Sequence, residues 1–325
     1  MSFTKISPSG SILFFVWVVA ACTIPVTREI DNRLMKRANY HEAIQVGYLA
    51  NKELYEASGL ACSRLRADVL WAINDGGSGP FLYAINTRGA HLGKVHLLNA
   101  QNQDWEDLAS FRLQDIAYLL IADVGDNSEN RADYSIYFIR EPTISDKPLP
   151  SLLSAESVEW ERRLRFIYED GSHDCESVAV DLSSRQILLL SKRAKPPTLY
   201  MLPLVTQTGE SLQVAKKLSH ISVMPQPTLQ DLISNPKFGY YHSQPTAMDV
   251  SPNGATAVIL TYKNAYLFQR ARGENWPEAF IKIPQQILLP KLRQAEALCF
   301  ATDGKTLFVT SEKLPAPLLR LEAIR

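Results

Sequence analysis

The chain has 325 residues, of which 46% are hydrophobic, so it is long enough and apolar enough to bury at least one large core. Its 34 basic and 34 acidic residues balance. Net charge therefore gives no argument for a nucleic-acid partner or for an anionic membrane surface, and only a locally charged site is compatible with it.

The first 22 residues are typical of a targeting segment. Lys5 supplies a positive charge, and Ile12–Ala21 is an unbroken apolar run that is too short for a permanent transmembrane helix. Small residues then precede Cys22, which resembles the lipobox of bacterial lipoproteins and predicts that Cys22 carries lipid. The alternative is an ordinary signal peptide. Both interpretations predict an extracytoplasmic protein, and the first predicts lipid anchoring to a bacterial membrane, in the periplasm or at the cell surface.

Three cysteines remain if Cys22 is lipidated. They are Cys62, Cys175 and Cys299, and none has a metal-ligand spacing such as C-x-x-C. We expect buried, small apolar side chains, with a disulfide between two of the three as the alternative.

Residues 23–42 are polar and rich in charge, which predicts a tether between the lipid and a folded domain over residues 43–325, with a short helix as the alternative. A repeat sets the expected fold of that domain. Inner-strand starts recur near residues 58, 106, 176, 246 and 296. Four strands with short turns need about 40–50 residues. The repeat therefore predicts an all-β propeller of five four-stranded blades.

Two of the repeats are longer, and they hold Pro-containing excursions at 143–154 and 223–243. Either could hide a degenerate blade, so six blades are the alternative. Residues 228–234 of the second excursion could form a helical turn. We expect the last strand of the second blade at 156–167 and that of the fourth at 279–283.

The fifth repeat has only three predicted strands, near 296–301, 306–311 and 317–323. A spare strand is predicted at 43–49, before the first repeat. In a closed propeller this N-terminal strand completes the last blade and removes its exposed edges.

The topology gathers charged residues on one face, because the loop entering each inner strand and the loop leaving each second strand open there near the axis. The inner-strand starts contribute Asp104, Glu106, Asp174, Glu176 and Glu296. The second-strand ends contribute Asn74, Asp75, Asp123, Asp126, Asn127, Lys192, Arg193, Tyr262, Lys263, Glu312 and Lys313.

Carboxylates crowded near an axis repel one another unless a cation compensates. A hard divalent cation, Ca²⁺ first, takes oxygen ligands from such side chains. The alternative is a structural ion network in which the lysines and Arg193 pair with the acids. Asp123–Asn127, with Gly125 allowing a tight turn, suits oxygen coordination or a simple capped turn. His173, beside Asp174, is a candidate ligand or general base, or a solvated loop residue.

At Asp104–Ala109, Asp123–Asn127, Asp174–Asp181 and Glu296–Thr310 the chain resembles secreted bacterial β-propellers of the phytase-like and SdiA-regulated kind. That resemblance implies a Ca²⁺-lined funnel that binds phosphate esters. It implies metal ligands at Asp75, Glu106, Asp123, Asp126, Glu176 and Glu296. It implies substrate contacts from Lys192, Arg193 and Lys263, with Lys313 as a further candidate. Gluconolactonase-type propellers also place a metal on inner-strand acids, so lactone hydrolysis is a rival.

Two classes of function follow. The first is a metal-dependent hydrolase, with Glu106, Glu176 and His173 as candidate catalytic residues. The second is a non-enzymatic envelope propeller that binds a protein or glycan through the funnel or through the 223–243 insertion. The expected partners are a membrane, through the N-terminal lipid, and a small anionic ligand or an envelope protein. We expect a monomer and no nucleic acid.

Overall fold

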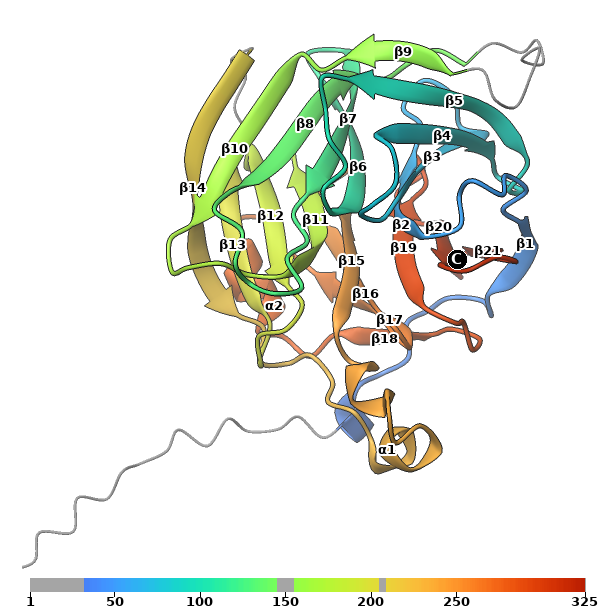
Figure 1. Cartoon of the computed structure of the whole chain (residues 1–325). Coiled ribbons are helices and arrows are strands. Elements are labelled where there is room, and N and C mark those ends of the chain that lie inside the picture. Colours follow the sequence, from blue (N-terminus) through green and yellow to red (C-terminus); the bar gives the residue numbers. More distant parts are fainter. Residues whose placement is uncertain (1–31, 145–154, 205–208, 325) are drawn as a thin grey trace, which may run out of the picture.

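The computed structural model describes residues 32–144, 155–204 and 209–324, whose antiparallel sheets are arranged in a ring (Figure 1). The predicted targeting segment and Cys22 lie outside the described residues. Of the predicted tether, residues 32–42 are described, and they run along the body, where the Ala38 amide donates to the Gln286 carbonyl at 2.8 Å. No helix in the described parts has the length and apolar character needed to cross a membrane.

The described strands form four hydrogen-bonded sheets. The first contains β2 (Ala57–Cys62), β3 (Val69–Asn74), β4 (Phe81–Asn86), β5 (His91–Leu98) and β9 (Glu156–Glu159). The second contains β6 (Trp105–Leu113), β7 (Ile116–Asp123), β8 (Tyr134–Arg140) and β10 (Arg162–Tyr168), followed by β11 (Cys175–Asp181), β12 (Gln186–Ser191), β13 (Thr198–Pro203) and β14 (Gly209–His220). Its two halves join where β10 and β14 pair in parallel.

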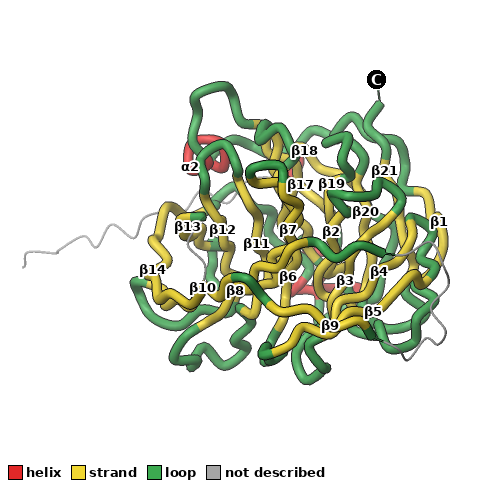
Figure 2. Tube along the Cα trace, turned by 90° about the horizontal axis from the view of Figure 1, so that it is seen from above, coloured by secondary structure: helices red, strands yellow, loops and turns green. Residues whose placement is uncertain are grey.

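The third sheet contains β15 (Pro245–Val250), β16 (Thr256–Thr261), β17 (Asn264–Gln269) and β18 (Gln285–Leu288). The fourth contains β19 (Ala295–Phe300), β20 (Leu307–Ser311), β21 (Pro317–Leu321) and β1 (Ile44–Tyr48), and β1 pairs antiparallel with β21. Strands and loops dominate the described chain (Figure 2), and the helices are η1 (Asn32–Leu34), α1 (Leu229–Ser234), η2 (Gly239–Tyr241) and α2 (Trp276–Phe280).

The inner strands surround a common axis. They contact one another in the order β2, β6, β11, β15, β19 and back to β2. Each begins within two residues of a predicted repeat start. The prediction of an all-β propeller is therefore confirmed.

Two strand predictions were wrong. The segment 156–167 is two strands, because β9 leaves the second blade and pairs with β5 of the first sheet, and β10 alone pairs with β8. The segment 279–283 is no strand. Asn275 and Glu278 form a capping box that starts α2, with Pro277 in its first turn, so local capping wins over the apolar pattern.

The core lies between neighbouring sheets. Side chains of β2 and β3 pack against side chains of β19, β20 and β21 in one cluster that includes Leu60, Leu70, Phe308 and Leu318. Each such buried leucine contributes about 1.5–3 kcal/mol. All three cysteines of the described chain are free and buried, as expected of small apolar side chains.

A candidate metal centre at the propeller axis

A β-bulge at the start of each inner strand positions the axial side chains. In β6, Trp105 pairs with Asp123 and Asp107 pairs with Ala122, so Glu106 has no partner on β7. The other four inner strands have the same irregularity. The bulge residues are Ser58, Glu106, Glu176, Thr246 and Glu296. A bulge bends the strand and changes the direction of the bulged side chain. The side chain at one position of each repeat therefore departs from the alternation of the strand.

The exit loops are fixed against the entry loops by backbone hydrogen bonds. The amides of Val124 and Lys192 donate to the carbonyls of Asp104 and Asp174 at 3.1 and 2.9 Å. The equivalent bonds of Asp75 and Glu312 to the entry loops measure 2.9 and 3.0 Å. This pairing brings entry and exit residues to one end of the sheets, as the topology predicted.

Two groups of carboxylates meet at this end. Asp75, Asp104 and Glu106 form one, and Glu106, Asp174 and Glu176 form the other. Within each group, carboxylate oxygens lie within 4.8 Å of one another, and Glu106 belongs to both. The side chains of the second group are buried, with 6, 0 and 5% of Glu106, Asp174 and Glu176 exposed. We call these five residues the axial acid cluster.

Two glycines make room for the cluster. A Cβ atom on Gly125 would lie 2.5 Å from Asp104 Oδ2 and still closer to Glu106 Oε1. A Cβ atom on Gly76 would lie 2.5 Å from Asp104 Oδ1. Both glycines are thus required by close approach rather than by a turn, because a methyl group at either site would displace the carboxylates.

Burial and mutual repulsion favour the protonated carboxyl groups. Burial, followed by the charge of Asp75, raises the pKa of Asp104 to about 7. Burial, followed by the charge of Glu176, raises the pKa of Glu106 well above its ordinary value. Burial also raises the pKa of Glu176, although the neighbouring Lys192 opposes the shift. The free energy of the charged cluster is therefore high unless a cation is added.

Only part of the cluster is compensated within the described chain. Lys192 forms a buried ion pair with Glu176. Burial disfavours the charge of Lys192, but the attraction of Glu176 and Glu106 outweighs it and raises the pKa of Lys192. Arg193 Nε lies 2.7 Å from Asp174 Oδ2. The predicted structural ion network is therefore present at Glu176 and Asp174.

Glu106 differs from these two acids. Among the residues that the structure describes, none donates a hydrogen bond to its carboxylate. Glu106 is 6% exposed and its carboxylate lies among the other acids of the cluster, so its charge is left to be compensated by water or by a cation. The chemistry of the cluster, oxygen ligands only, matches the preference of Ca²⁺.

Glu296 and Glu312 continue the acidic lining beyond Lys192. Burial, followed by a hydrogen bond to Glu312, raises the pKa of Glu296 well above its ordinary value. Gln294 Nε2 donates to Glu312 Oε2 at 2.7 Å. Tyr262 shares this side, because its ring lies 5.3 Å from Lys192 Nζ.

Asp123 and Asp126 are engaged elsewhere. Asp123 Oδ1 lies 2.8 Å from Arg131 Nη1 and accepts from the Asp104 amide at 3.1 Å. Asp126 accepts from the amide of Arg131 at 2.8 Å and from the Tyr134 hydroxyl at 2.9 Å. The structure does not bring either carboxylate into the axial acid cluster. Both hold the loop after β7 in place.

Three further predicted residues lie outside the cluster. Lys263 Nζ pairs with Asp231 at 2.5 Å, and Lys313 donates to Gln294. His173 Nε2 lies 2.8 Å from Asp170 Oδ1 and 2.7 Å from the Tyr200 hydroxyl. Their predicted roles in substrate binding or catalysis gain no geometric support.

Asp107 was missed by the sequence reasoning. It is 1% exposed, and its Oδ2 accepts from the amide of Val178 at 2.7 Å and from that of Met248 at 3.2 Å. It therefore crosslinks β6, β11 and β15 directly beneath the bulge. A carboxylate next to Glu106 in an apolar strand was the available signal.

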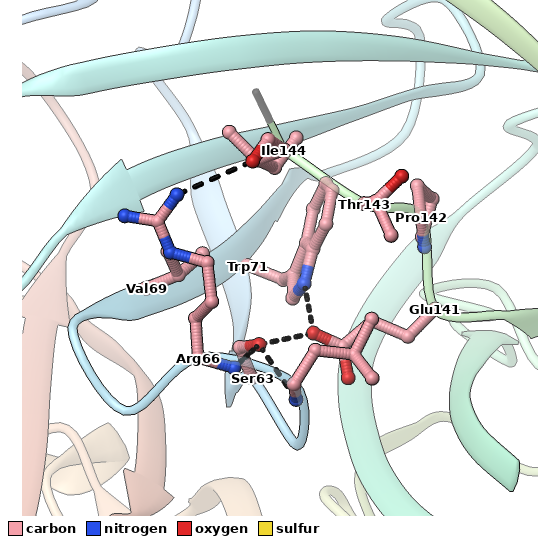
Figure 3. Close-up of a pocket in the computed structure, with 9 residues that line it drawn as sticks. Ser63, Arg66, Val69, Trp71, Glu141, Pro142, Thr143 and Ile144 are labelled. Atoms are coloured by element: carbon pink, nitrogen blue, oxygen red, sulfur yellow. Dashed lines mark hydrogen bonds between the residues drawn. The ribbon is translucent and has the colours of Figure 1, made fainter. Parts of the chain in front are cut away.

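A cavity of about 120 Å³ lies at the opposite end of β2, where Ser63 follows the strand (Figure 3). Glu141 enters it, and its carboxylate accepts hydrogen bonds from Trp71 Nε1 at 3.0 Å and the Arg64 amide at 2.8 Å. The acid here is fully used in joining β3 to the end of β8. The cavity is separate from the axial acid cluster.

No protein-family model and no curated protein sequence matched the chain. Among solved structures, it is similar to a gluconolactonase from Xanthomonas campestris at 12% identity, covering 82% of this chain and 72% of that one, with a TM-score of 0.43. It is similar to the PQQ-bound aldose sugar dehydrogenase of Streptomyces coelicolor at 10% identity, covering 86% and 98%, with a TM-score of 0.47. For U3-55K the identity is 11%, the coverage 82% and 67%, and the TM-score 0.37. These likenesses carry no inference about activity.

Proposed function

We propose that the axial acid cluster binds a divalent cation, Ca²⁺ first, and that the chain is a metal-dependent hydrolase of phosphate esters. The observation that carries the metal site is Glu106, a buried carboxylate that receives no hydrogen bond from the described residues and is shared by both carboxylate groups. Gly76 and Gly125 support it, because they leave room for the carboxylates to approach one another.

The ligands in this proposal are the five cluster residues, and Glu296 lines the same axis. A bound divalent ion would polarise the ester and lower the pKa of a water molecule. Arg193, whose side chain is 33% exposed beside Asp174, would meet the anionic group of the substrate at the rim. Lys192 would hold Glu176 in place through their buried ion pair.

The proposal also includes a finer description of the fold and of the location. We propose five blades closed by β1, which is supported by the ring of inner strands and by the pairing of β1 with β21. We propose an extracytoplasmic protein attached to a bacterial membrane through its N-terminal segment, on the evidence of Ile12–Ala21 and Cys22 in the sequence.

Thermal unfolding of the full chain tests the metal site. Ca²⁺ at a hundredfold excess over its dissociation constant should stabilise the fold by about 2.7 kcal/mol relative to chelator. Glu106→Gln should abolish this increment. Glu141→Gln is the matched control, because it changes a buried Glu outside the cluster and should leave the Ca²⁺ response intact. An unchanged melting temperature with every divalent ion tried would remove the metal site from consideration.

A screen of phosphate esters and lactones then tests catalysis. Hydrolysis of a phosphate ester should require Ca²⁺ and should be lost in Glu106→Gln and Glu176→Gln. If only lactones were hydrolysed, the proposed substrate class would change from phosphate esters to lactones, and the proposed metal site would stand. Ca²⁺ binding without hydrolysis of either class would favour the alternative function, a non-enzymatic propeller that binds a protein or glycan.

A further inference from the structure

The segment between β14 and β15 carries an exposed apolar surface. Its large side chains are Leu229, Leu232, Ile233, Phe238 and Tyr240, which are 73, 42, 63, 49 and 41% exposed. We call them the insertion surface. Leu229, Leu232 and Ile233 follow i, i+3, i+4 spacing in α1 and so share one side of the helix. Figure 1 shows α1 projecting beyond the ring of sheets.

The insertion is folded with its polar groups inward. Asp231 and Thr228 form the capping box of α1. The Asp231 carboxylate also pairs with Lys263 Nζ at 2.5 Å and with His242 Nδ1 at 3.2 Å. Asp231 is 5% exposed. Since these contacts fix α1 to the β16–β17 turn, the apolar side chains are held outward by specific bonds.

The charge of the insertion selects one kind of partner. Asp231 is the only acid between residues 221 and 244, and its charge is internal. Lys237 and Lys195 are exposed, and their Nζ atoms lie 4.9 Å from the Phe238 ring and 5.7 Å from the Tyr240 ring. Apolar and aromatic side chains flanked by lysines suit a bilayer interface with anionic headgroups.

The N-terminal segment enters the fold at the same place. Asn32 Nδ2 donates to the Gln226 carbonyl of the insertion at 3.0 Å. Ten residues separate Cys22 from Asn32 in the sequence, and a chain of that length spans at most about 35 Å. A lipid or apolar anchor within residues 12–22 would therefore be tethered to the fold beside the insertion, where Asn32 contacts Gln226.

We propose that the insertion surface rests on the lipid bilayer to which the N-terminal segment is attached. The inference builds on the anchoring proposed above and is independent of the metal site. Asp231 of the insertion pairs with Lys263, which follows Tyr262 in the loop that leaves β16. The insertion therefore lies at the end of the sheets that holds the axial acid cluster. The docked orientation would place the mouth of the cluster near the membrane surface.

Nitroxide accessibility in the full chain tests the docking. The Ile233→Cys chain carries the probe, and Ile281→Cys is the matched control, because both isoleucines are 63% exposed and Ile281 follows α2 at the opposite end of the sheets. Both chains are reconstituted into vesicles of phosphatidylethanolamine and phosphatidylglycerol. The labelled unsubstituted chain corrects for any label on Cys22.

The probe at 233 should collide severalfold more often with oxygen, relative to a water-soluble nickel chelate, than the probe at 281. Adding Leu229→Glu should reduce that difference. Equal nickel accessibility at both sites, in a chain that floats with the vesicles, would overturn the docking surface but leave the anchoring. A chain that does not float would overturn both. Protection of position 233 from both reagents would indicate a protein contact and would also overturn the proposal.

Discussion

Buried carboxylates lie at both ends of the inner strands, and the two ends treat them in opposite ways. At the end of β11, Asp181 accepts hydrogen bonds from Arg270 Nη1 at 2.6 Å and Trp276 Nε1 at 2.9 Å, and from two serine hydroxyls at 2.6 Å. Burial opposes its charge, but these donors outweigh burial and lower the pKa of Asp181 to about 2. At the start of β6, Glu106 has no donor among the described residues and its pKa is raised.

The difference distinguishes carboxylates that stabilise the fold from carboxylates that are available to bind a ligand. A carboxylate surrounded by donors, such as Asp181, is stabilised as an anion by the fold itself. Glu106 and its neighbours are held close together without enough donors, so the fold bears their repulsion. Such a cost is expected where a ligand supplies the missing charge. The following predictions test this contrast, from the largest expected effect to the smallest.

Removing the charge of Asp181 should be far more damaging than removing that of Glu106. Asp181→Asn leaves the largely buried Arg270, whose side chain is 10% exposed, without its counter-ion, which should cost about 3–5 kcal/mol of unfolding free energy. Glu106→Gln, measured by urea unfolding in chelator, should cause no loss, because it removes repulsion. Equal losses in the two variants would erase the distinction between the two ends.

A methyl group at Gly125 should abolish the response to Ca²⁺. The added Cβ atom would overlap the carboxylates of Glu106 and Asp104, so Gly125→Ala should eliminate the Ca²⁺-dependent rise in melting temperature. Gly77→Ala is the control. Gly77 has a φ of 81°, and no atom lies within 4 Å of the position that a methyl group would take, so alanine there should cost about 1 kcal/mol while the Ca²⁺ response persists. A normal response in Gly125→Ala would place the ion elsewhere.

The acidic end of the sheets could be predicted from the sequence. Turn residues and apolar runs recur at fixed spacing, so the propeller and its acidic face followed from topology. The bulges could not be predicted, since register depends on pairing across the sheet. The bulges determine that the side chains of Glu106 and Glu176, rather than those of adjacent residues, are redirected.

Other features were set by contacts between distant or unexpected partners. Asp123 was expected at the site, but Arg131 pairs with it. Lys192 was expected to meet substrate, but it is buried against Glu176. Neither pairing has a signature in spacing. The capping box of Asn275 and Glu278, in contrast, is visible in the sequence, although the apolar residues of 279–283 led to the prediction of a strand.

The pH dependence of stability should change sign when Ca²⁺ is added. The pKa of Asp104 is raised to about 7, so the folded state binds more protons than the unfolded state between about pH 4 and 7. In chelator, its contribution to stability is therefore present at low pH and is lost as the pH rises through that range. With Ca²⁺, binding displaces protons, and affinity should increase with pH.

Calorimetric unfolding at several pH values checks this reversal. Asp104→Asn should make the decline in chelator shallower, because it removes one of the titrating carboxyl groups. The proton release on Ca²⁺ binding can be read from titrations in two buffers of different ionisation enthalpy. Ca²⁺ affinity that is constant from about pH 5 to 8 would contradict the raised pKa values of the cluster.

The smallest effect is expected at Lys313, although it was a sequence candidate for substrate binding. Its side chain donates to Gln294 rather than to a carboxylate of the axial acid cluster. An exposed contact of this kind contributes about 0–1 kcal/mol, so Lys313→Ala should leave unfolding, Ca²⁺ affinity and KM for an ester nearly unchanged. Arg193→Ala is the informative partner, because Arg193 lies on Asp174 at the rim and its loss should raise KM. If Lys313→Ala raised KM as much as Arg193→Ala, the anion would bind on the β19 side of the axis and Glu312, not Asp174, would border it.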